Sequence, residues 1–133
     1  MLGNFFSKIY SGEIQGESLG INIDIFNDKG VSIKNEYTKG ELVVKKPFPS
    51  MPINFWNDES GKKYHKAYFN KFPNIWHHGD YVQMTNNGGF IIHGRSDSTL
   101  NPGGIRIGTA EIYREVESFD LINEALVIGQ KWD

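Results

Sequence analysis

Several features that would quickly assign a class of protein are missing from this sequence. The chain contains no cysteine, which excludes disulfide bonds and thiolate chemistry. Basic residues do not outnumber acidic ones, 14 against 16, so the chain has no general electrostatic attraction for nucleic acids or anionic membranes. No apolar run reaches the length of a membrane span, and residues 1–8 carry no signal-peptide pattern. We therefore expect a cytoplasmic protein with no nucleic-acid or membrane partner.

Apolar and aromatic residues are abundant enough for a folded core. Hydrophobic residues make up 38% of the sequence and aromatic residues 14%, which is typical of a folded chain rather than a disordered one. With 133 residues the chain is about the size of one domain and can bury a modest core. No internal repeat is visible.

Short strands joined by turns are predicted in the first half of the chain. Apolar and polar side chains alternate over residues 19–26, and the following Asn27-Asp28-Lys29-Gly30 has the composition of a turn. We therefore expect a strand over 19–26 and its hairpin partner over residues 31–34. Residues 40–45 contain a short apolar run that predicts another strand.

A second hairpin, two helical segments and a last strand are predicted in the second half. Asn86-Asn87-Gly88-Gly89 favours a turn because these residue types tolerate positive φ. Ile112, Val116 and Phe119 recur at helical spacing and predict an amphipathic helix. The ranges expected are strands over 80–85, 90–93 and 125–128 and helices over 63–69 and 110–119.

A change of pattern near Asp97 predicts a boundary within the chain. Before it come strands joined by turns, and after it come a loop, one helix and one strand, which is the opening of an α+β unit that is not completed. We therefore expect an α+β chain. Residues 1–96 form a strand-rich, small β-barrel-like subdomain, and residues 97–133 form the truncated start of an α+β C-terminal domain.

Asp80 is a candidate for binding a nucleotide sugar. A carboxylate only accepts hydrogen bonds, and a ribose offers two neighbouring hydroxyl donors. Gly79, directly before Asp80, allows another group to approach closely. The alternative reading is that Asp80 only caps a turn, which is common for aspartate.

Arg95 and Arg106 bracket a loop that contains Gly103-Gly104. Guanidinium groups fork onto phosphate or ribose oxygens, so the pair can hold an anionic ligand; alternatively, they pair with nearby acidic residues on the surface. The two glycines allow a ligand to approach the backbone, although a plain turn also uses them. Their spacing matches neither a Walker-type phosphate loop nor the dinucleotide-binding fingerprint.

We expect no metal site, although the chain offers His77, His78, His93 and Asp80. Neighbouring histidines on an extended segment point to opposite faces. No His-Glu-x-x-His or similar ligand spacing is present.

Four short motifs follow one another in a characteristic order. They are Gly-Asp-Tyr at 79–81, Gly-Arg-x-Asp at 94–97, Asn-Pro-Gly-Gly-x-Arg at 101–106 and Gly-x-Ala-Glu-Ile-Tyr at 108–113. The series resembles the adenylate-forming acyl-CoA synthetases at the hinge between their large N-terminal and small C-terminal domains. Residues 10–15, 19–20, 40–43, 52–58 and 67–73 look like the acetoacetyl-CoA synthetase branch. The likeness covers nearly the whole chain, so residues 1–96 resemble the end of the large domain.

The resemblance implies a two-step ligase. A short carboxylic acid, acetoacetate or similar, attacks the α-phosphate of ATP to give an acyl-adenylate and pyrophosphate, and the thiol of coenzyme A then displaces AMP. ATP/AMP and coenzyme A are therefore the implied cofactors. Mg²⁺ is implied for the full-length enzyme but is not ligated by these residues.

The resemblance also implies roles for individual residues. Asp80 would hold the ribose hydroxyls and Arg95 would contact the nucleotide. Asp97 would be the hinge about which the small domain rotates between the two steps. Gly103-Gly104 would lie beside the coenzyme A path, with Arg106 facing the nucleotide phosphate during thioester formation.

Parts that this chemistry needs are expected to lie outside the chain. In the resembling enzymes the pyrophosphate loop, most of the acyl pocket and the lysine that assists adenylation are elsewhere, so we expect an internal fragment that is inactive alone. The chain is alternatively one part of a split enzyme, with apolar faces around Ile112 and Val127 binding the missing remainder. A further alternative is a free-standing nucleotide-binding or interaction module.

Overall fold

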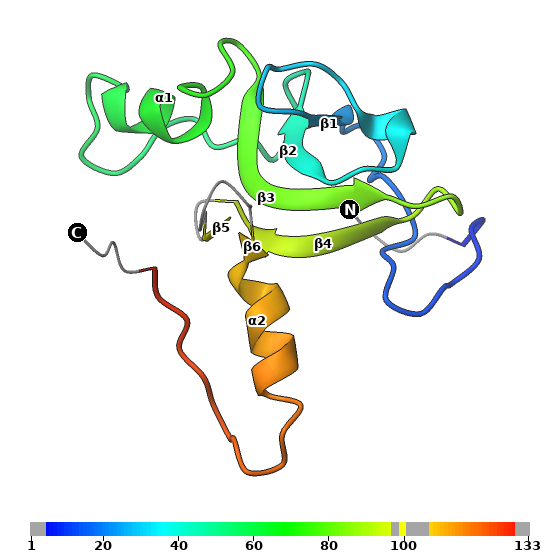
Figure 1. Ribbon diagram of the computed structural model, residues 1–133. Coiled ribbons are helices and arrows are strands. Elements are labelled where there is room, and N and C mark those ends of the chain that lie inside the picture. The colour runs from blue at the N-terminus through cyan, green and yellow to red at the C-terminus, as the bar shows by residue number, and fades with distance from the viewer. Residues whose placement is uncertain (1–4, 97–98, 101–106, 130–133) are drawn as a thin grey trace.

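The centre of the computed structural model, which describes residues 5–96, 99–100 and 107–129, is an antiparallel sheet of four strands. The strands follow one another in chain order, β1-β2-β3-β4, and a two-stranded sheet, β5-β6, lies beside them (Figure 1). The strands are β1 (Ile23–Phe26), β2 (Gly40–Val44), β3 (Trp76–Met84), β4 (Phe90–Arg95), β5 (Thr99–Leu100) and β6 (Ile107–Gly108). The helices are α1 (Lys62–Tyr68), α2 (Thr109–Val116) and the 3-10 turn η1 (Lys34–Glu36).

The predicted α+β, strand-rich class is confirmed, and several predicted elements are found close to their expected ranges. The strand over 40–45 is β2, the helical turns over 63–69 are α1, and the hairpin around Asn86–Gly89 joins β3 to β4. Both hairpin strands extend beyond the predicted ranges. β3 begins at Trp76, before the predicted start at 80.

Two predicted strands are not formed as strands. Residues 31–34 do turn back onto β1, with one antiparallel bridge, Phe26 with Ser32, and backbone hydrogen bonds from the Asn27 N–H to Val31 and from the Ile33 N–H to Ile25, but the chain then enters η1. β1 pairs along its length with β2, a partner that the sequence did not indicate. Residues 125–128 form no strand and pair with no described strand.

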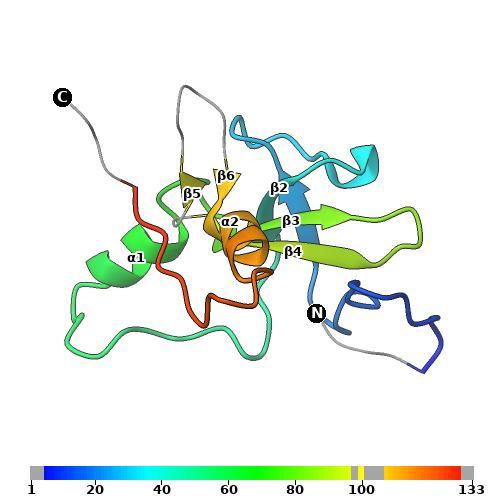
Figure 2. The same ribbon diagram turned by 60° about the horizontal axis from the view of Figure 1, so that its bottom comes forward.

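The helix predicted over 110–119 ends earlier, at Val116. The Ser118 hydroxyl donates a hydrogen bond to the Glu115 carbonyl oxygen, and Phe119 is 64% exposed, so the third apolar position of the predicted face is not packed. The chain then runs back past α2 (Figures 1 and 2). The Val127 N–H donates to the Tyr113 hydroxyl oxygen at 3.1 Å.

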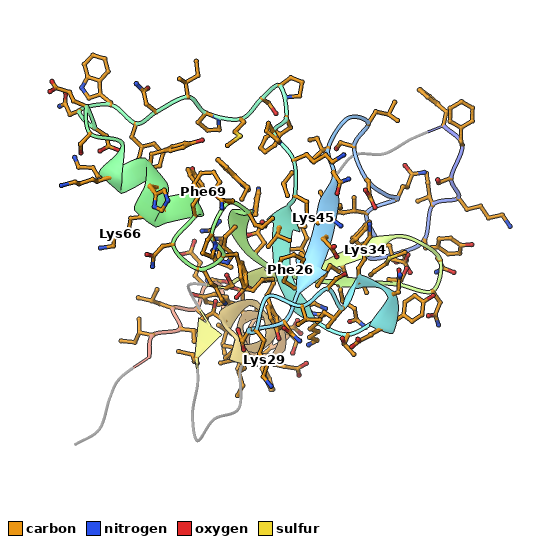
Figure 3. The ribbon with its side chains drawn as sticks, turned by 90° about the horizontal axis from the view of Figure 1, so that it is seen from above. Phe26, Lys29, Lys34, Lys45, Lys66 and Phe69 are labelled. Atoms are coloured by element: carbon orange, nitrogen blue, oxygen red, sulfur yellow. The ribbon has the colours of Figure 1, made fainter. Side chains whose placement is uncertain are left out.

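The core lies where the sheet meets aromatic side chains from α1. Tyr68 stacks on Trp76 with a ring-centroid distance of 3.7 Å. Figure 3 shows Phe69, directly after α1, on the sheet side of the helix, whereas Lys66 points away. The buried residues of this cluster are Ile23, Ile25, Ile33, Leu42, Val44, Trp76, Val82 and Phe90, and a second, smaller cluster contains Phe26, Val43 and Phe72. None of the described helices is long and apolar enough to cross a bilayer.

Candidate functional site

The candidate site lies where β3 bends sharply (Figure 1). Val43 pairs with His77 and Glu41 with Tyr81, so two steps along β2 correspond to four along β3, and β3 carries extra residues in between. Gly79 lies within this bulge and has a φ of +85°, a conformation that costs other L-residues strain. Bulges of this kind bend a strand and redirect its side chains.

The bulge brings Asp80 and Arg95 together. The two residues are register partners of β3 and β4, and the Arg95 Nη1 atom lies 3.6 Å from Asp80 Oδ1. The same Nη1 donates a hydrogen bond to the His78 carbonyl oxygen at 3.3 Å. The sequence identified both residues as candidates but did not predict that they form a pair.

Gly79 leaves the space that Arg95 occupies. A Cβ atom at position 79 would lie 2.6 Å from Arg95 Nη2 and 3.1 Å from its Cζ, which is far inside van der Waals contact. The sequence predicted that Gly79 lets another group approach closely. In the structure, that group is the Arg95 guanidinium. Asp80 itself is inside β3, and the turn-capping alternative does not describe it.

His78 is a third member of the site. Its Nδ1 atom lies 2.7 Å from Asp80 Oδ2, and its side chain is 46% exposed against 16% for Asp80. From the sequence, His78 was a candidate only as a metal ligand. The signal that was missed is its spacing from Asp80. Residues i and i+2 of a strand share a face, so His78 and Asp80 can be expected to lie close together.

A buried cluster of charged side chains, centred on Glu41, lies close to the candidate site. Glu41 is 1% exposed, and its carboxylate contacts Lys71 Nζ at 2.6 Å and His77 Nε2 at 2.9 Å. Burial alone would raise the pKa of Glu41, but hydrogen bonds from His77, Lys71 and the Ser96 side chain outweigh it and lower the pKa to about 2. Glu41 is thus ionised, and its cluster joins β2 and β3 to Ser96, which directly follows β4.

Glu41 was not singled out from the sequence. A glutamate inside a predicted strand normally lies on the solvent face, and its three partners are at least 30 residues away along the chain. Only the fold brings them together, since Lys71 lies in the loop before β3.

Four residues predicted for the site, Asp97, Gly103, Gly104 and Arg106, lie outside the described residues. Within the described part of the chain, no group of three or more histidine, aspartate or glutamate side chains gathers where it could hold a metal ion.

The arrangement of Asp80 and Arg95 suits a hydroxyl-rich anionic ligand. An ionised carboxylate has about four lone-pair positions, and the described contacts of Asp80 are those from His78 and Arg95. Room remains for two more donors, such as neighbouring hydroxyls of a sugar. Arg95, with a side chain 52% exposed, adds a permanent positive charge beside them.

Both the fold and the sequence of the chain are similar to those of known proteins. No family model matches the chain. Its fold is similar to part of an acyl-CoA ligase, an anthranilate CoA ligase solved in complex with anthranoyl-AMP, with a TM-score of 0.65 and 20% identity over 91% of this chain and 22% of that chain.

The sequence relatives are more specific. The whole chain is 56% identical to a segment of acetoacetyl-coenzyme A synthetase from Rhizobium meliloti, and 96% of it is 50% identical to the enzyme from Macaca fascicularis. The acetoacetyl-CoA synthetase structure from Streptomyces lividans matches 91% of the chain with a TM-score of 0.82 and 46% identity, over 18% of that chain. The chain therefore matches an internal segment of acetoacetyl-CoA synthetases and spans about a fifth of the length of these relatives.

Proposed function

We propose that this chain is a segment of an AMP-forming acid–thiol ligase that joins acetoacetate to coenzyme A at the expense of ATP. An acyl-adenylate and pyrophosphate form first, and the thiol of coenzyme A then displaces AMP. The proposal is supported by the names of relatives that are 56% and 50% identical. The small-molecule substrate, ATP, coenzyme A, Mg²⁺ for the complete enzyme and a cytoplasmic location all follow from this assignment. The isolated chain is expected to be inactive.

Within the ligase, Asp80 holds the ribose hydroxyls of the nucleotide and Arg95 contacts the nucleotide beside them. The observation that carries this assignment is the Asp80–Arg95 pair across the β3 bulge. A half-buried carboxylate accepts hydroxyl donors more strongly than an exposed one, because less water competes for it. Mg²⁺ would be held by residues outside this segment.

Asp97 acts in this proposal as the hinge between residues 1–96 and 97–133, with Arg106 and Gly103-Gly104 on the moving side. What supports the hinge position is the anchoring of the residue before it. Ser96 is 8% exposed, its N–H donates to the Gly79 carbonyl oxygen at 2.8 Å, and its side chain hydrogen-bonds to Glu41. Hinge residues are typically loop or element-terminal positions that absorb a change of backbone dihedral angles, and Asp97 lies two residues after the end of β4.

A segment exchange tests the proposed function. The matching segment of the Rhizobium meliloti enzyme is replaced by this chain, and acetoacetate-dependent pyrophosphate release and thioester formation are measured. We expect an active chimera that loses most of its activity with Asp80→Ala but keeps it with Asp120→Ala, a substitution at an exposed position. A folded chimera with no activity would refute the assignment.

A second candidate function is that the chain is one part of a split enzyme, and one observation favours this function. The segment after α2 exposes large apolar side chains that a partner polypeptide would cover. They are Phe119, Leu121, Leu126 and Ile128, at 64%, 98%, 82% and 72% exposure. The predicted apolar positions Ile112 and Val127 are only partly exposed. Co-expression with the complementary segments of a relative, followed by co-purification, tests this candidate.

The third candidate, a free-standing nucleotide-binding module, is separated from the others by calorimetry. AMP is titrated into the isolated chain and into its Asp80→Ala variant. Measurable binding that the substitution abolishes supports the module. Heat signals that are equal for both proteins count against it.

A further inference from the structure

His78 reaches the site through both its ring and its backbone. The ring Nδ1 lies 2.7 Å from Asp80 Oδ2, and because an ionised carboxylate carries no proton, Nδ1 is the donor. The His78 carbonyl oxygen accepts a hydrogen bond from Arg95 Nη1 at 3.3 Å. His78 therefore contacts both residues that are candidates for binding the nucleotide, Asp80 and Arg95.

The surroundings of His78 leave Asp80 as its charged partner. On its other side the residue borders a cavity of about 290 Å³ that is lined mainly by apolar side chains, among them Val44, Phe48 and Trp76. The lining contains no other charged group, and its hydroxyl comes from Ser50. Among the described residues, the charged groups that contact His78 are the Asp80 carboxylate, at the ring, and the Arg95 guanidinium, at the backbone carbonyl oxygen.

We propose that His78 is a positioning residue of the nucleotide site, which fixes the Asp80 carboxylate so that its remaining lone pairs face the ribose diol. The proposal rests on the proposed function and deepens it. Without the Nδ1 donor, the Asp80 side chain can rotate toward Arg95 and form a tighter ion pair, because only the 3.6 Å contact now separates them. The lone pairs of the Asp80 carboxylate would then accept hydrogen bonds from Arg95 instead of from the hydroxyls of the sugar.

The test uses the chain itself, with AMP and 2′,3′-dideoxy-AMP as probes in NMR titrations that detect weak binding. The dideoxy compound lacks the diol, so the ratio of the two affinities reports the contact with Asp80. His78→Phe removes the donor and keeps the bulk of the ring. His78→Asn keeps a donor near the place of Nδ1. His65→Phe, on the exposed side of α1, is the matched control.

We expect His78→Phe to weaken AMP binding about tenfold, the worth of one hydrogen bond to a charged group, and to abolish the preference over dideoxy-AMP. His78→Asn should restore both within about twofold, as a donor of this strength would, and His65→Phe should change neither. The ¹⁵N shifts of His78 should show a protonated Nδ1 that changes with Asp80→Asn.

Unchanged or tighter AMP binding by His78→Phe overturns the positioning role, and so does equal weakening by His78→Phe and His78→Asn. A wild-type chain that binds AMP and dideoxy-AMP equally refutes the ribose contact of Asp80 itself. That result concerns the proposed function, and it is distinguishable because it does not depend on any His78 variant.

Discussion

Replacement of Glu41 by glutamine is expected to remove a large pH-dependent part of the stability of this chain. The folded-state pKa of Glu41 is about 2, against an ordinary value of 4.5, so folding favours the ionised form. Because the folded pKa is the lower one, the stabilisation is fully present above pH 4.5 and is lost as the pH falls from 4.5 to 2. A difference of about 2.5 pKa units corresponds to about 3 kcal/mol.

The glutamine variant keeps the volume of the side chain but not its charge. At pH 7, Lys71 and His77 lose the Glu41 carboxylate, although Lys71 keeps its ion pair with the exposed Asp28, and we expect the variant to be less stable by about 3 kcal/mol. At pH 2, which equals the folded-state pKa of Glu41, about half of the folded wild-type chain is protonated at this residue and the unfolded chain almost fully, so the gap should shrink below about 1 kcal/mol. The exposed Glu36→Gln is the matched control and should follow the wild-type curve at both pH values.

Urea unfolding followed by tryptophan fluorescence measures both gaps, since Trp76 lies in the core. A difference between wild type and Glu41→Gln that is the same at pH 7 and pH 2 would refute the reasoning. It would mean that the substitution acts through packing or shape and not through the charge of Glu41.

Three further substitutions test the fold and the site. Gly79→Ala and Gly88→Ala introduce similar backbone strain, at φ of +85° and +80°, but only the substitution at position 79 adds a clash with Arg95. We therefore expect only Gly79→Ala to shift the NMR signals of the Arg95 side chain. Identical Arg95 signals in the two variants would contradict the close approach of Arg95 to Gly79. Phe90→Ala should cost about 3–5 kcal/mol in urea unfolding, because Phe90 is 1% exposed, while its neighbour Ile92, at 40%, should tolerate alanine. Tyr113→Phe removes the acceptor of the Val127 N–H, so hydrogen exchange at Val127 should accelerate by roughly tenfold or less, and unchanged exchange would show that the bond is not formed in solution.

The sequence predicted those parts of the fold that depend on neighbours in the chain. The turn at Asn86–Gly89 and the helix α1 follow from local residue types. The pairing of β1 with the more distant β2 was not predicted, because alternation marks a strand but does not name the partners on its two edges. Those partners depend on the area buried between strands, which is a property of the assembled sheet.

In the candidate site, too, individual residues could be predicted from the sequence but their contacts could not. Asp80 and Arg95 were identified by chemistry and by motif, yet their pairing depends on bulges in β3 and β4 that shift the register between the strands. Gly79 was a visible signal for close approach, but nothing in the sequence named the group that approaches. Glu41 could not be found, because a buried carboxylate is recognisable only when its distant partners are placed around it.

The adjacent histidines of β3 connect the buried cluster with the candidate site. Successive residues of a strand point to opposite faces, and His77 contacts the buried Glu41 while His78 contacts the half-buried Asp80. A shift of β3 by one residue relative to its neighbours would break the His77–Glu41 contact and move Asp80 out of register with Arg95 on β4. The Glu41 cluster therefore helps to hold the register that places Arg95 beside Asp80, and in a chain with Glu41→Gln the loss of stability should be accompanied by weaker AMP binding even though Glu41 does not contact the site.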